Sequence, residues 1–279
     1  MPDILLHLAS QIVATLLYAG LGVHFWHTRW HESGKPRDPL PMQAWERIAI
    51  AIALAAQGTG LYEGLFATGT LRFSFSLAAS LMLWLAVLIY WLESFQSRMD
   101  GMQPMVLPLA AISSILPVVF PQTHEIGHAN AFGFKVHFLA AMLAYSLFTL
   151  SALHALFMGF VEQRLHRRAI HRHQASLPSI LAMESLLFRM IGVAFALLTV
   201  TLISGLFFSE QIFGKALVLD HKTLFAFASW MIFAALLIGR VKYGWRGKIA
   251  LRWTLAGFLL LILAYIGSRF VSEVLLGRI

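Results

Sequence analysis

Long apolar runs alternate with short polar segments along the whole chain. The apolar runs hold few charged side chains, and most of those stand near an end of a run. At a rise of about 1.5 Å per residue, a helix of about 20 apolar residues crosses a hydrocarbon core about 30 Å thick. The runs cover residues 4–25, 48–66, 73–92, 105–120, 134–160, 183–208, 217–239 and 252–271. The pattern predicts an all-α, polytopic integral membrane bundle with eight transmembrane helices.

The run at residues 105–120 differs from the others because it is short and rich in proline. Pro104, Pro108, Pro117 and Pro121 lie in it or beside it. Proline removes a backbone donor, which lipid cannot replace. We therefore expect this helix to be tilted or kinked and packed within protein.

Composition supports one membrane domain rather than two soluble ones. Of all residues, 59% are hydrophobic and only 12% are charged, whereas soluble proteins have about a quarter charged residues. No internal repeat or linker divides the chain. We expect a single transmembrane domain over residues 1–279.

Positive charge lies mainly in alternate loops between the apolar runs. With the N-terminus outside, 15 of the 21 Lys and Arg residues fall in loops on the inner side. This is the bias that cytoplasmic loops carry, so it predicts that the N-terminus faces outward. The net charge of +8 is then explained by topology, and the expected partner is the lipid bilayer rather than nucleic acid.

Cysteine is absent from the sequence. The chain therefore has no thiol nucleophile and cannot carry out dithiol exchange. Any thiol reduction linked to its function must belong to a partner.

Among the histidines, His137 is the strongest candidate for chemistry. It lies just inside the outer end of a long apolar run, where a polar ring is costly without a partner. A neutral imidazole there can ligate haem iron, or it can simply cap the start of the helix. Zinc pairs at i, i+4 spacing are a weaker alternative at His27/His31 and His124/His128. Most inner-side histidines, His24 among them, lie in interfacial or loop sequence and are expected to be solvated or snorkelling side chains. His154 lies near the end of the run at 134–160, too far from His137 to share a site with it.

The second half of the sequence resembles the cytochrome c assembly family of haem-handling membrane proteins, of CcsA and CcmC type, and especially its short YpjD-like branch. In that family a histidine opens a helix with a tyrosine one or two turns on; here the segment is VHFLAAMLAYS, with His137 and Tyr145. An outer loop and an apolar helix follow as SGLFFSEQIFGKALVLDHKTLFAFASW, which keeps Asp220, Lys222 and Trp230. The GWRGK and AYIGSRF segments match the last inner loop and last helix. At the family's inner-side histidine the chain has Gly239.

The resemblance implies a haem site on the outer side. It implies haem b held by His137, with Tyr145 and Asp220 nearby. Of the family's ligands only His137 is matched, and His221, which stands where the family has a proline, is our own candidate for the second metal ligand. Phe207, Phe208 and Phe213 would form an apolar shelf in place of the family's loop tryptophans.

The function implied is a bacterial inner-membrane assembly factor that presents haem for cytochrome c maturation. Such a protein binds and transfers haem and is not an enzyme, and its partners would be other maturation proteins. The alternative is a haem-free carrier, regulatory subunit or scaffold with the same fold. Ionisable groups at membrane depth would then form a polar path, and small residues would serve helix contacts. The candidates for these roles are Gln57, Glu63, Glu184 and Arg189 for the path, and Gly20, Gly22, Gly58 and Gly60 for the contacts.

Overall fold

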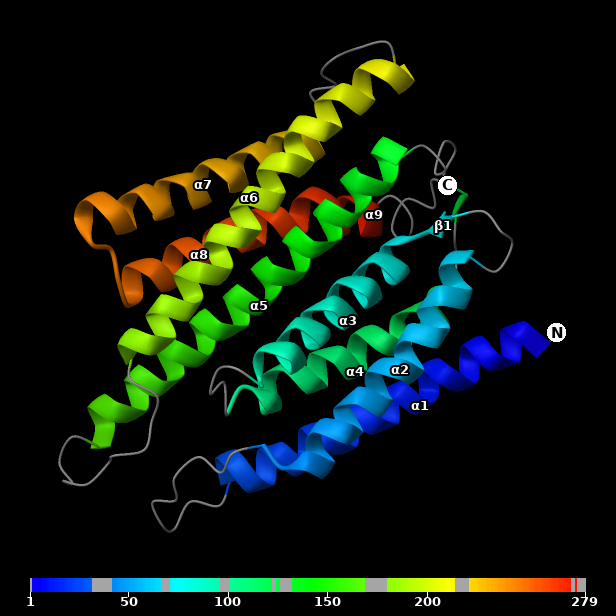
Figure 1. Cartoon of the computed structure of the whole chain (residues 1–279), viewed down its shortest axis with the longest axis horizontal. Coiled ribbons are helices and arrows are strands. Elements are labelled where there is room, and N and C mark those ends of the chain that lie inside the picture. The colour runs from blue at the N-terminus through cyan, green and yellow to red at the C-terminus, as the bar shows by residue number, and fades with distance from the viewer. Residues whose placement is uncertain are drawn as a thin grey trace. The chain divides into compact units, whose positions relative to one another are not determined.

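The protein is almost entirely helical (Figure 1). The computed structural model describes residues 2–31, 42–66, 71–95, 101–121, 124–125, 132–168, 180–213, 221–271 and 274. The chain forms two compact units. The first unit comprises Met1–Glu125 and Val161–Ile180, and the second comprises Ile126–Phe160 and Leu181–Ile279. That all of residues 1–279 form one domain stays a prediction.

The first unit contains four long helices. Its elements are α1 (Pro2–Phe25), the π-helix η1 (Trp26–His31), α2 (Ala44–Phe66), β1 (Arg72–Phe73), α3 (Phe75–Glu93), α4 (Gln103–Val119) and β2 (His124–Glu125). Helix α1 packs against α2 and α4, and α3 packs against the same two helices. The two short strands pair antiparallel, with Arg72 opposite Glu125.

Glycines allow close contacts between these helices. A Cβ on Gly22 of α1 would lie 3.1 Å from the Pro108 ring of α4, and one on Gly58 of α2 would lie 3.3 Å from Trp84 of α3. A Cβ on Gly60 would lie only 2.6 Å from the Gln11 amide nitrogen. Of the four predicted contact glycines, Gly20 alone has open space around it. The other three serve packing inside the first unit.

Polar side chains also join the helices of the first unit. The hydroxyls of Thr15 and Ser114 lie 2.8 Å apart, and the Gln57 amide donates to the Ser80 hydroxyl at 3.0 Å. Gln57 is fully buried, so this bond ties α2 to α3. The role of Gln57 in the structure is therefore a helix contact.

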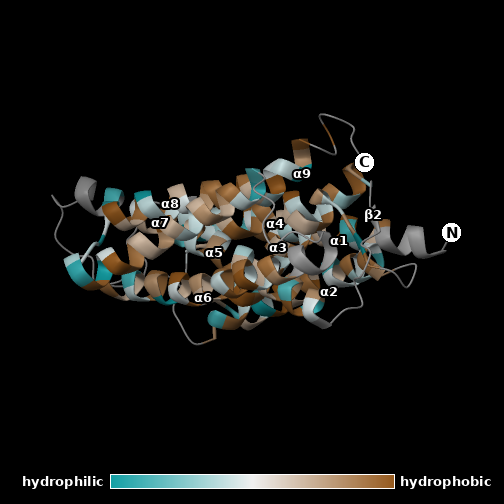
Figure 2. Ribbon diagram, turned by 90° about the horizontal axis from the view of Figure 1, so that it is seen from above, coloured by the Kyte–Doolittle hydropathy of each residue, from teal (hydrophilic) through white to brown (hydrophobic). Residues whose placement is uncertain are grey.

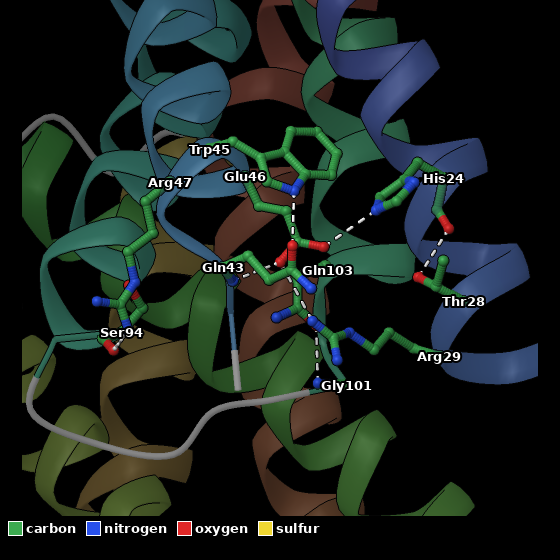
Figure 3. A network of polar contacts seen from close by, with 10 residues as sticks. All are labelled: His24, Thr28, Arg29, Gln43, Trp45, Glu46, Arg47, Ser94, Gly101 and Gln103. Atoms are coloured by element: carbon green, nitrogen blue, oxygen red, sulfur yellow. Dashed lines mark hydrogen bonds and ion pairs between the residues drawn. The ribbon is translucent and has the colours of Figure 1, made fainter. Parts of the chain in front are cut away.

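A buried carboxylate organises one end of the first unit (Figure 3). Glu46 is 3% exposed and accepts from the Gln43 backbone N–H at 2.7 Å, which caps the first turn of α2. It also bonds to the Arg29 guanidinium at 3.2 Å and to Nε2 of His24 at 3.0 Å. The carboxylate thus fixes the end of α1 and η1 to the start of α2. The expectation that His24 is merely solvated was wrong, because Glu46 binds it.

The second unit contains three long helices and a shorter one with an irregular end. They are α5 (Phe132–Arg168), α6 (Ile180–Phe213), α7 (His221–Tyr243) and α8 (Lys248–Ile262), followed by the π-helix η2 (Leu263–Gly267) and the short α9 (Ser268–Phe270). The last residues of α5 belong to the first unit by their contacts. Helices α5 and α6 are longer than the predicted spans.

Aromatic and hydroxyl side chains hold the core of the second unit together. Phe148 of α5 stacks on Phe233 of α7 with ring centroids 3.9 Å apart. The Ser229 hydroxyl donates to the Gly257 carbonyl at 2.8 Å, joining α7 to α8. The Trp230 indole donates to the Thr199 hydroxyl at 2.9 Å, joining α7 to α6. Trp230, which the sequence pattern singled out, is thus a packing residue.

At the C-terminal end of α7, the Glu184 carboxylate of α6 organises the turn into α8. Glu184, 3% exposed, accepts from the Gly247 N–H at 2.9 Å, and Arg240 lies 3.9 Å from its second oxygen. Gly247 has a φ of +53°, a conformation that favours glycine. Nearby, Nε2 of the buried His154 donates to the Met183 carbonyl at 2.9 Å. His154 therefore joins α5 to α6 as a structural residue.

The helices have the length and apolar surface of membrane spans. Among the described residues, seven helices are long and apolar enough to cross a membrane, and α4 is a shorter apolar helix. Hydrophobic residues run along the helices and hydrophilic ones gather towards their ends (Figure 2). Large apolar side chains such as Leu16 and Met231 are exposed, as lipid-facing positions require. The polytopic membrane bundle is confirmed, and the count of eight spans stays a prediction because it depends on α4.

The short helix α4 behaves as its prolines predicted in one respect. It packs against α1 and α3, and Pro108 and Pro117 lie inside it without ending it. Its Ser113 and Ser114 are buried and bond to carbonyls of their own helix. The helix therefore packs one face against protein, while Leu109 and Ile112 on another face are exposed.

One local boundary was wrong. Residues 209–213, expected in an outer loop after the run at 183–208, continue helix α6 to Phe213. The stretch contains no strong helix breaker until Gly214, so the helix can extend past the apolar run.

Candidate functional site

The candidate site lies at one end of the second unit. There α5 begins, α6 ends and α7 begins, as the antiparallel course of the three helices requires (Figure 1). Two sequence-predicted ligands, His137 and His221, belong to the second turn of α5 and the first turn of α7, respectively.

His137 is held by a hydroxyl of the neighbouring helix. Its Nδ1 lies 2.9 Å from the hydroxyl oxygen of Ser204 on α6. The Ser204 hydroxyl in turn donates to the Val200 carbonyl at 2.7 Å, or to the Thr201 carbonyl at 3.1 Å. Because a hydroxyl has one proton, Ser204 accepts from His137 when it donates to its own helix. In the arrangement where Ser204 donates to its own helix, the imidazole proton lies on Nδ1.

That tautomer has a chemical consequence. With the proton on Nδ1, the lone pair of a neutral imidazole is on Nε2. A histidine that ligates a metal commonly donates its other ring N–H in this way, which orients the ring and raises its basicity. This hydrogen-bonding pattern is compatible with His137 as a metal ligand, a role that stays a prediction.

Gly205 provides room for the ring. A Cβ at this position would lie 3.4 Å from Cε1 of His137. That is ordinary contact distance, so the imidazole lies directly against the backbone of α6 at Ser204 and Gly205. A bulkier side chain at Gly205 would displace it.

Tyr145 lies deeper in the second unit. It is eight residues after His137 on α5, which corresponds to about 12 Å along the helix axis. The side chain is 8% exposed, and its ring meets that of Tyr265 edge-on with centroids 6.1 Å apart. The structure therefore makes Tyr145 a core residue between α5 and η2.

The remaining predicted site residues are less well placed by the structure. His221 is exposed at the first residue of α7, and Phe207 is 65% exposed on α6. Asp220 and the side chains of Phe208 and Phe213 lie outside the described residues. A shared site of His137 with His221, and the aromatic shelf, stay predictions.

Two residues of the site were missed by reasoning from sequence. Ser204 and Gly205 stand at the start of the segment singled out above, but nothing in a linear pattern shows which helix they contact. A Ser-Gly pair one or two turns inside the end of an apolar helix was the available signal. Within the described residues no group of three or more His, Asp or Glu side chains could hold a metal ion, which removes support for a zinc site there.

Comparison with known proteins decides the family. Residues 45–276, spanning both units, match the family described as cytochrome c assembly protein. The chain belongs to this cytochrome c assembly family. That membership assigns it to cytochrome c biogenesis and agrees with the resemblance seen around His137.

Individual relatives cover different parts of the chain. The inner membrane protein YpjD of Escherichia coli K12 is 27% identical over 237 residues, 83% of this chain and 89% of its own length. An uncharacterized 28.8 kDa protein of Azospirillum brasilense is 32% identical over 54% of this chain and 56% of its own. The cytochrome c biogenesis protein CcsA of Prochlorococcus marinus is 36% identical over 90 residues, 32% of this chain and 29% of its own. No solved structure matches.

The inner end of α7 differs from what the family resemblance would supply. Gly239 stands where a histidine was expected, and a Cβ there would collide with the Trp245 ring. The backbone N–H of Trp245 also donates to the Gly239 carbonyl at 3.2 Å. The indole thus occupies the space that a side chain at this position would need.

Proposed function

We propose that the protein binds haem b at the outer end of its second unit, with Nε2 of His137 as an axial ligand, and presents it for cytochrome c maturation. The observation that carries the proposal is the His137–Ser204 hydrogen bond at 2.9 Å, which orients the imidazole near the start of α5. The YpjD relatives are named inner membrane proteins, and we infer the same multi-pass location for this chain.

Each residue has a separate role in this proposal. His137 supplies the iron ligand, Ser204 orients the ring, and Gly205 admits it. Haem bound there supplies the prosthetic group of the cytochrome. His221, at the start of α7, is the proposed second ligand, and Phe207 an apolar contact for the porphyrin.

The protein is proposed as a binding and transfer factor rather than an enzyme. It has no cysteine, so reduction of the apocytochrome thiols must come from another protein. Other maturation proteins are therefore its expected partners.

The test is an absorbance spectrum of protein purified from haem-replete cells. We expect a Soret band that disappears in His137→Ala. Loss of the band in His221→Ala as well would support bis-histidine ligation, whereas an unchanged band would support a single protein ligand. His27→Ala, an exposed histidine of η1 in the first unit, is the matched control and should keep the full band.

Absence of a Soret band in wild-type protein, even after haem is added, would overturn the haem proposal. The haem-free carrier or scaffold would then take its place. Gln57 and Glu184 would remain structural residues in that case, because both are engaged in contacts between helices or with a turn.

A further inference from the structure

A groove of about 650 Å³ lies between α2 and α3 in the first unit. Its surface is almost wholly apolar. The side chains of Thr59 and Tyr62 at its edge are exposed, Tyr62 by 68%, so the groove opens to the outside of this unit. Its lining comprises Ala55, Gly58, Thr59, Leu61, Tyr62, Glu63, Leu65, Leu81 and Trp84.

Trp84 forms a fixed wall of this groove. Its indole N–H donates to the Leu54 carbonyl of α2 at 2.8 Å, and its ring lies against Gly58. A Cβ on Gly58 would be 3.3 Å from the ring, closer than a relaxed contact. Because this hydrogen bond and the contact with Gly58 hold the indole against α2, the wall of the groove is preformed, as ligand sites usually are.

Glu63 is the single charged residue of the lining. Its Oε2 is buried and has no hydrogen-bond partner among the described residues. A buried carboxylate oxygen is costly unless a cation or a donor meets it. The groove therefore combines an apolar wall with one unmet anionic acceptor.

The position of Glu63 in the helix indicates the shape of the ligand. It lies three residues before the end of α2, about 4.5 Å along the axis, and so near the membrane interface. Ala55, at the other end of the lining, lies about 12 Å deeper in the bilayer. A ligand that fits both ends has a cationic, hydrogen-donating head and an apolar tail.

We propose that this groove binds a phospholipid with a primary ammonium head group, of the phosphatidylethanolamine class. The ammonium would donate to the Glu63 carboxylate while an acyl chain lies along Gly58, Leu81 and Trp84. A choline head group has no N–H to donate, and an anionic head group would meet like charge. Haem carries carboxylates of its own, so this site is independent of the haem site proposed above.

The test measures which lipid the purified protein retains. The protein is reconstituted in vesicles containing equal amounts of dioleoyl phosphatidylethanolamine and dioleoyl phosphatidylcholine, extracted in mild detergent and examined by native mass spectrometry. We expect the ethanolamine lipid to be retained about tenfold more than the choline lipid, as one charge-assisted hydrogen bond would give. Glu63→Gln removes the charge and keeps the volume of the side chain. In this variant we expect the two lipids to be retained about equally, because the charge-assisted hydrogen bond is lost.

Two further variants make the test specific. Glu93→Gln, at the opposite end of α3, is the charge-matched control and should keep the preference. Ala55 is exposed and lines the end of the groove away from Glu63. Ala55→Trp fills that end and should lower retention of both lipids. Circular dichroism and gel filtration establish that each variant is folded. Equal retention of the two lipids by wild type, or an unchanged preference in folded Glu63→Gln, would overturn the proposal.

Discussion

At the residue scale, Ser204 controls His137 more directly than any neighbour in sequence. The Ser204 hydroxyl lies 2.9 Å from Nδ1 of His137 and is also bonded to the Val200 carbonyl of its own helix, so it fixes the orientation of the ring. The bond joins α5 to α6 across 67 positions of sequence.

Replacing this hydroxyl tests that role. In Ser204→Ala we expect haem affinity to fall about tenfold or more, the usual cost of losing an outer-shell partner of a metal ligand. Spectroscopic haem titration measures the affinity, and the Soret position reports a change in ligand basicity. Ser151→Ala is the matched control, since Ser151 on α5 donates only along its own helix, to Leu147. Equal losses in both variants would show a general effect on the bundle instead.

The Glu46 carboxylate is a second residue-scale test, on stability. Its removal in Glu46→Ala leaves the Arg29 side chain, 5% exposed, without its carboxylate. Breaking a buried pair from one side costs about 3–5 kcal/mol, so thermal unfolding followed by tryptophan fluorescence should shift several degrees lower. The double variant Glu46→Ala/Arg29→Met should recover part of the loss. A single variant as stable as wild type would contradict the role given to this carboxylate.

At the element scale, the turn from α7 to α8 depends on one acceptor from α6. Glu184 binds the Gly247 N–H, and Gly247 adopts a φ that other residues avoid. Without the carboxylate, the turn loses a charge-assisted hydrogen bond.

We therefore expect Glu184→Ala to destabilise the second unit by about 1–3 kcal/mol. The thermal midpoint in detergent measures the effect. Lys248→Gln, an exposed change in the same turn, serves as the control and should be close to neutral. An equal shift of the thermal midpoint in the two variants would show that any change of charge near this turn has the effect, and would contradict a specific role for the Glu184–Gly247 hydrogen bond.

Gly239 and Trp245 provide a second element-scale test, by a double-mutant cycle. Gly239→Ala adds a Cβ that collides with the indole, which should cost about 1–3 kcal/mol of stability. In the Trp245→Ala background the same change should cost far less, because the colliding ring is gone. Additive losses would show that the ring and the glycine do not interact.

At the scale of the whole molecule, the testable quantity is orientation in the membrane. The excess of Lys and Arg in alternate loops predicts that residues 159–185 and 239–251 face the cytoplasm. The cysteine-free chain allows a direct test with single introduced cysteines. Gln174→Cys should resist an impermeant thiol reagent in intact cells, and Gln211→Cys should react. The reverse labelling would invert the orientation.

Much of the whole molecule follows from local properties of the chain. Apolar runs of helical length lead to helices, because a backbone in lipid must bond within its own segment. The predicted runs therefore match α1 to α8 closely, and His137 could be singled out as a polar ring near the end of such a run. The extension of α6 to Phe213 was missed, because hydropathy marks the edge of the bilayer and not the end of a helix.

The partners of individual side chains were decided only by tertiary structure. That Ser204 meets His137, that Glu46 meets Arg29 and His24, and that Trp245 fills the space beside Gly239 depend on how helices rotate and pack. Glu63 is an example of the same limit: the sequence marks it as an ionisable group near membrane depth, but only the packing of α3 on α2 makes an apolar groove beside it. Sequence by itself determines which segments enter the membrane, since that depends on each segment's own transfer free energy. Which face of each helix meets its neighbour depends on side-chain shape across the interface, and the linear pattern does not contain it.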